Sequence, residues 1–70
     1  IEMNLATVRA VRATGIPAVY GDATRVETLI EAGLDRAESL VISADLEAAA
    51  EVVRQAIARR PDLRIMARCA

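Results

Sequence analysis

The chain has 70 residues, enough for one domain at most, and a domain of this size buries only about 60% of its unfolded surface. A single cysteine and no histidine argue against a disulfide framework and against a zinc-type site. Nine arginines, no lysine and ten acidic residues give a net charge of −1, and the single aromatic residue offers no stacking surface, so nucleic-acid binding is not expected.

The chain carries no targeting signal that can be identified. Its apolar runs are only a few residues long, far shorter than a membrane span. It begins with Ile1 and Glu2 and not with a methionine and a basic segment, so we expect no signal peptide. We therefore interpret the chain as an excerpt from a longer protein in a reducing, cytoplasmic setting.

The first part of the chain predicts a strand, a helix and a second strand. Residues 1–3 resemble the tail of a strand, and Asn4 is a suitable N-cap for a helix that Gly15 ends. Residues 16–20 (I-P-A-V-Y) are short, apolar and β-branched, and they predict a buried strand.

A second helix is predicted after the break at residues 21–23 (G-D-A). Thr24 followed by Glu27 forms a capping box, in which two side chains bond the free backbone N–H groups at a helix start. We expect Gly33 to end this helix as the residue after its C-cap.

A turn at residues 34–37 leads to the clearest strand, residues 39–43 (S-L-V-I-S), and then to the longest helix. Asp45 is the expected cap of that helix and Pro61 its stop, and residues 63–67 (L-R-I-M-A) predict a last strand. The expected buried stripe of the long helix consists of Leu46, Ala49, Ala50, Val53 and Ile57.

The predicted order is therefore (β)αβαβαβ. Short apolar strands that alternate with amphipathic helices are typical of a parallel sheet covered by helices on both faces. We expect an α/β fold with right-handed crossovers.

Three ordered motifs resemble one known family. Residues 20–33 match Y-G-D-A-T-R-x-x-x-L-x-x-A-G, residues 37–42 match A-x-x-L-V-I, and residues 61–68 match P-x-x-x-I-x-A-R. This set resembles the nucleotide-binding domain of the RCK (regulator of potassium conductance) family, and most closely the cytosolic domain of Kef-type cation:proton antiporters. The resemblance covers essentially the whole chain and implies a Rossmann-like fold.

The chain departs from the family at the phosphate-binding loop. The family's G-x-G-x-x-G motif has no counterpart, because Gly15, Gly21 and Gly33 have the wrong spacing. In the family this loop precedes the position of Glu2, so residues 1–70 are expected to be a partial Rossmann-type regulatory domain, the C-terminal portion without the first strand. That strand is central in the order 3-2-1-4-5-6, so we expect strands on both sides of a gap.

The resemblance implies that one group of residues binds the adenosine part of a nucleotide. Glu2, at the end of a strand, would accept hydrogen bonds from the ribose hydroxyls of an adenine nucleotide; the alternative is a solvated terminal acid. Asp22 and Ala23 would contact the adenine, although Gly-Asp is also a common turn. Thr24 is expected to act only as an N-cap.

The other candidates end the last two strands. Ser43 and Ala44 would touch the dinucleotide or its phosphates, although a serine at a strand end is also an ordinary cap. Arg68 would pair with phosphates or with acids of a neighbouring subunit, or is a plain surface arginine.

The resemblance implies a sensor and not an enzyme. NAD(H), AMP or ATP would bind as a regulatory ligand and gate a potassium channel or potassium:proton antiporter at the cytoplasmic face of the inner membrane. The implied partners are a membrane ion-transport domain, in the same or a separate chain, and further copies in a homo-oligomer. The alternative is a fragment of an NAD-dependent dehydrogenase, which the absence of histidine and lysine disfavours without excluding it. The same lack of lysine disfavours a phospho-receiver domain.

Overall fold

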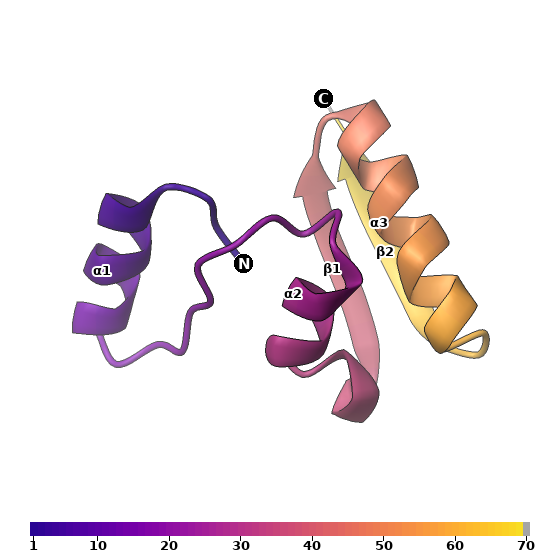
Figure 1. Cartoon of the computed structure of the whole chain (residues 1–70), viewed down its shortest axis with the longest axis horizontal. Coiled ribbons are helices and arrows are strands. Elements are labelled where there is room, and N and C mark those ends of the chain that lie inside the picture. The colour runs from indigo at the N-terminus through magenta and orange to yellow at the C-terminus, as the bar shows by residue number, and fades with distance from the viewer. Residues whose placement is uncertain (70) are drawn as a thin grey trace.

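The structure, a computed structural model, describes residues 1–69. An N-terminal helix stands apart from a unit of helices and strands formed by the rest of the chain (Figure 1). In chain order the elements are α1 (Leu5–Ala13), α2 (Val26–Glu31), the 3-10 helix η1 (Leu34–Arg36), β1 (Ser39–Ala44), α3 (Leu46–Arg59) and β2 (Arg64–Cys69).

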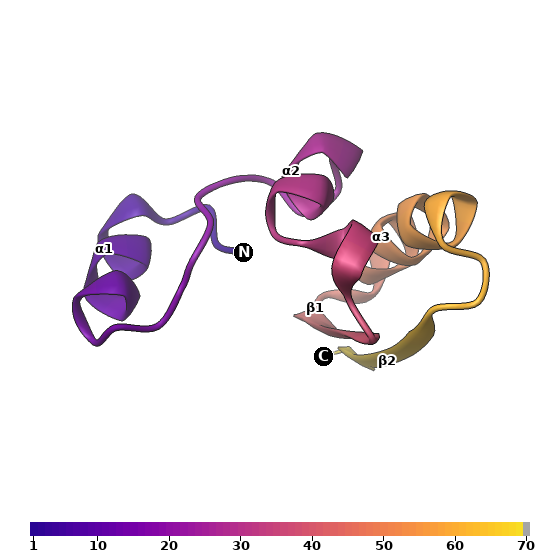
Figure 2. The same cartoon turned by 90° about the horizontal axis from the view of Figure 1, so that it is seen from below.

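The two strands form a parallel sheet, in register from the pair Ser39–Arg64 to the pair Ala44–Cys69. Helices α2 and α3 lie on the same side of this sheet (Figure 2). The opposite face is open: Val41 and Met66, paired across the strands, are 68% and 55% exposed. The fold is therefore the expected α/β fold with parallel strands, but within the described residues helices cover one face of the sheet and not both.

The core lies between the sheet and the two helices on it. Small residues on α3 let its backbone approach the strands closely. This buried cluster comprises Leu29, Leu34, Ile42, Ala49, Val52, Ala56 and Leu63.

The predicted stripe of α3 is only partly correct. Ala49 is buried and Val53 packs against the core, but Leu46 and Ile57 are 70% and 47% exposed, and Ala50 is also exposed. The helix carries apolar residues on two adjacent faces. The face that includes Ala49 packs against the sheet. Periodicity alone could not choose between these faces.

The N-terminal segment, residues 1–20, confirms the predicted helix. Asn4 caps α1 by accepting a hydrogen bond from the backbone N–H of Thr7 at 3.1 Å, and Gly15 follows with a positive φ of 87°. The predicted buried strand 16–20 is wrong, because only Tyr20 forms a bridge, to Glu2, and Tyr20 is 53% exposed. Within the described residues no further strand joins this bridge, and a lone pair of extended segments buries little apolar surface.

The capping box of α2 is also wrong. The N-cap is Arg25, which makes no side-chain cap bond, and the hydroxyl of Thr24 instead donates to Asp22 at 2.7 Å. Asp22 forms an Asx turn, in which its side chain accepts hydrogen bonds from Thr24. Thr24 therefore does not cap the helix, and the N-cap moves by one residue to Arg25. Gly33 ends the helix as predicted, with a φ of 108° that favours glycine.

The strands thus form two parallel pairings that do not join. The bridge between Glu2 and Tyr20 belongs to one, and β1 with β2 forms the other. This division agrees with a partial Rossmann-like sheet interrupted at its centre.

Candidate functional site

A cavity of about 520 Å³ lies where the two strand pairings face each other. Its walls come from three segments of the chain: residues 1–3, residues 21–24 and residues 40–45, with α2 and α3 contributing further contacts. Parallel strands bind ligands at their carboxyl ends in folds of this class. The lining includes five of the six predicted site residues, Glu2, Asp22, Ala23, Ser43 and Ala44.

Glu2 is positioned by the bridge to the segment before Gly21. Its backbone N–H donates to the carbonyl of Val19 at 3.0 Å, and its carbonyl accepts from the N–H of Gly21 at 3.0 Å. Its side-chain Oε2 accepts from the backbone N–H of Asn4, also at 3.0 Å. One carboxylate oxygen of Glu2 is thereby anchored at the wall of the cavity.

Asp22 is fixed by its own turn. Its Oδ1 accepts hydrogen bonds from the backbone N–H of Thr24 at 2.9 Å and from the hydroxyl of Thr24 at 2.7 Å. The hydroxyl bond above all, and then the N–H bond, hold the pKa of Asp22 below its ordinary value. Burial opposes them by a smaller amount, and the charge of Arg25 makes the smallest contribution. Asp22 is therefore an ionised acceptor at neutral pH, and the adjacent Ala23 is half-buried against the core.

Ser43 and Ala44 occupy the carboxyl end of β1. Ala44 packs against the core, whereas Ser43 is exposed on the other face of the strand. Asp45 follows as the N-cap of α3, with Oδ1 accepting from the backbone N–H of Ala48 at 2.8 Å. Sequence reasoning gave Asp45 only the role of a cap, although its place directly after a strand also indicated a site residue.

Arg68 is the one predicted site residue that does not line the cavity. It lies on β2 opposite Ser43 in the strand register, and its side chain is exposed. Its contact with a phosphate or with a neighbouring subunit stays a prediction.

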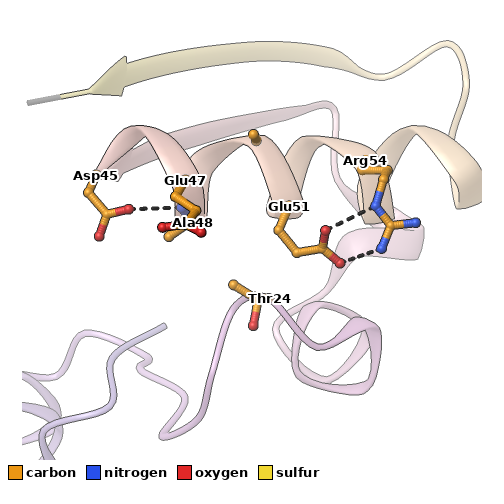
Figure 3. Close-up of a pocket in the computed structure, with 7 residues that line it drawn as sticks. Thr24, Asp45, Glu47, Ala48, Glu51 and Arg54 are labelled. Carbon is orange, nitrogen blue, oxygen red and sulfur yellow. Dashed lines mark hydrogen bonds and ion pairs between the residues drawn. The ribbon is translucent and has the colours of Figure 1, made fainter.

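A second hollow, of about 580 Å³, adjoins the cavity between Thr24 and the first turns of α3 (Figure 3). Its charged lining consists of Asp45, Glu47, Glu51 and Arg54. Hydrogen bonds from Arg54 first, and then from Gln55, lower the pKa of Glu51. Although this hollow is slightly larger, its lining contains no residue of β1 or β2, so the smaller cavity is the better candidate site.

Parallel strands with helices packed on one face, and a cavity that runs along β1 to its carboxyl end, are features of a Rossmann-like α/β domain. The chain belongs to the TrkA-N domain family, whose model matches residues 1–70. This confirms the resemblance to RCK-type domains and their Kef-type members.

One similar protein is named as a K⁺ efflux antiporter, KefB, of Alkalimonas amylolytica. It is 39% identical to this chain over 69 residues, which is 97% of the chain but only 10% of the relative's length. No solved structure gave a significant match. Within the described residues no helix is both long enough and apolar enough to cross a membrane.

Proposed function

We propose that this domain is a nucleotide sensor that regulates potassium transport. Its cavity takes the adenosine part of NAD(H), AMP or ATP, with Glu2 accepting from the ribose hydroxyls and Asp22 and Ala23 at the adenine. The domain works with a membrane ion-transport domain at the cytoplasmic face of the inner membrane and assembles as a homo-oligomer. Ser43 and Ala44 form the opposite wall of the same ligand site.

The observation that carries this proposal is the shared cavity. Residues 2, 22–23 and 43–44 are far apart in the sequence, yet all of them line one hollow, which runs along β1 to its carboxyl end. Similarity to a protein named as a potassium efflux antiporter supports the transport partner.

Regulation requires that the ligand prefer one arrangement of the domain. A ligand can shift gating only by its difference in affinity between two states. Because the cavity has one wall on the N-terminal segment and another on β1, a bound nucleoside would hold these two parts at a fixed distance. That distance is the structural quantity that we propose is transmitted to the transport domain.

The test uses the full-length protein in lipid vesicles. Potassium flux is measured with and without NADH, AMP or ATP, and NADH oxidation is followed in parallel with a panel of carbonyl acceptors. We expect flux that depends on nucleotide and no turnover of NADH. Flux that ignores every nucleotide would refute the regulatory role, and turnover that survives purification would favour a dehydrogenase.

A further inference from the structure

We propose that Asp45 is a specificity-determining residue of the cavity: its charge makes the site take the uncharged nucleoside part of a ligand and reject phosphate groups near the end of β1. This inference rests on the proposed function and states which part of a nucleotide the site selects. It starts from the charges that line the cavity.

All the charged side chains that line the cavity are acidic. They are Glu2, Asp22 and Asp45, one from each of the three wall segments. Within the described lining there is no arginine to balance them. A wall whose described lining has three carboxylates and no cationic side chain is unfavourable for a phosphate, which carries negative charge itself.

Each of these carboxylates is anchored in the same way. Oε2 of Glu2 accepts from the N–H of Asn4, and Oδ1 of Asp22 accepts from Thr24. Oδ1 of Asp45 accepts from the N–H of Ala48. Among the described residues no hydrogen bond reaches the second oxygen of any of the three carboxylates. Oriented carboxylate oxygens with a remaining acceptor position suit ligand groups that donate, such as ribose hydroxyls and an adenine amino group.

Asp45 occupies the position where many α/β proteins bind phosphate. The free N–H groups and the dipole at the start of a helix attract anions. In α3 the side chain of Asp45 takes the N–H of Ala48 and places its own negative charge at that helix end. Farther along α3, Glu47 and Glu51 border the adjoining hollow, and the nearby Arg54 is already paired with Glu51.

The remaining nearby arginines do not line the cavity. Arg25 follows the Asp22 turn, but it does not line the cavity, and its Nε lies 3.9 Å from Oε2 of Glu27. Arg68 lies on β2 and also stays outside the lining. The charged side chains at the cavity wall near the end of β1 are therefore acidic.

The experiment compares adenosine, AMP and ATP, titrated into the full-length protein by calorimetry without Mg²⁺. Asp45→Ser and Asp45→Asn remove the charge but keep a good N-cap residue. We expect both variants to raise the affinity for ATP relative to adenosine by about three- to tenfold at low salt, the size expected for removing one nearby charge. High salt should remove most of this gain.

The matched control is Asp62→Ser, because Asp62 follows the far end of α3 and does not line the cavity. It should leave the ratio of ATP to adenosine affinity unchanged. An unchanged ratio in both Asp45 variants, with adenosine still bound, would overturn the inference and leave the proposed function intact. Failure of the unaltered protein to bind any of the three ligands, or NADH in a parallel titration, would instead refute the proposed function itself.

Discussion

The N-terminal segment, residues 1–20, and the unit formed by residues 21–69 are built in different ways. In the first segment Val8 is the only buried hydrophobic residue among those described, whereas the cluster of seven core residues comes entirely from the second. The first segment is held by local contacts such as the Asn4 cap and the bond from Nε of Arg12 to the carbonyl of Ala18.

The second unit is held by contacts between distant parts of the chain. Arg59 makes two hydrogen bonds to Asp35, 24 residues away, and Arg60 donates to the carbonyl of Leu34. Local signals such as the Asn4 cap are therefore enough to form a helix, whereas the burial of α2 and α3 depends on contacts between distant parts of the chain. Since Glu2 lies in the weakly packed segment, a ligand that bridges the cavity would also order that segment.

We expect the largest difference between the two regions when a core side chain is truncated and the free energy of unfolding is compared. Leu29→Ala removes a side chain that is 2% exposed, and it should lower the free energy of unfolding of the second unit by about 2–5 kcal/mol. The matched variant Leu5→Ala, at a position 43% exposed, should change it by less than about 0.5 kcal/mol. Native-state hydrogen exchange of α3 amides in the full-length protein measures both, and equal effects would contradict the division.

We expect the next largest effect on stability at Gly21, where the two regions meet. A Cβ at this position would lie 2.8 Å from Cγ2 of Thr28, so Gly21→Ala should destabilise the protein by about 1–3 kcal/mol. Adding Thr28→Ser removes that methyl group and should restore part of the loss. If the double variant is as unstable as the single one by thermal unfolding, the close contact is not the cause.

The two helix caps offer a smaller and more local comparison. Asp45→Ala and Asn4→Ala each remove a side-chain bond to a helix N-terminus, which is worth about 1 kcal/mol. We expect faster exchange throughout the second unit for Asp45→Ala, but faster exchange confined to α1 for Asn4→Ala. Spread of the Asn4 effect into α3 would show that the regions unfold together.

The smallest effect concerns acid stability. The pKa of Asp22 lies below its ordinary value of 3.8, so its contribution to stability is complete above about that pH and is lost as the pH falls through the lower folded value. Thr24→Val removes the hydroxyl donor, so the pKa of Asp22 should rise toward 3.8. The stability lost in acid should then be smaller, and the loss should be complete at a higher pH. An NMR titration of the Asp22 carboxyl group measures this shift, and an unchanged pKa would contradict the assigned cause.

Much of the fold was predictable from the sequence because its signals are local. Asn4, Gly33 and Asp45 act at helix ends as predicted, and the strand at residues 39–43 is confirmed with one more residue. The strand at 16–20 and the exposed side of α3 were not predictable, because both depend on which segments pack against them. Periodicity records that a residue is apolar but not what covers it.

The site was predicted through the family motif more than through chemistry. The Asp22–Ala23 turn and the Ser43–Ala44 strand end share a cavity with Glu2, a grouping that spacing alone does not reveal. The position of Asp45 in the cavity lining was not predictable, because a capping residue and a cavity-lining residue look the same in sequence.

The proposed sensor depends on binding of an adenine nucleotide in the cavity through Glu2. Calorimetric titration of the full-length protein with NADH, AMP and ATP tests it most directly, alongside Glu2→Ala and the control Glu38→Ala, which lies outside the lining. We predict binding that weakens about ten- to a hundredfold in Glu2→Ala, the effect of losing a charge-assisted hydrogen bond, and stays unchanged in the control. Equal affinity of Glu2→Ala and the unaltered protein would contradict the account.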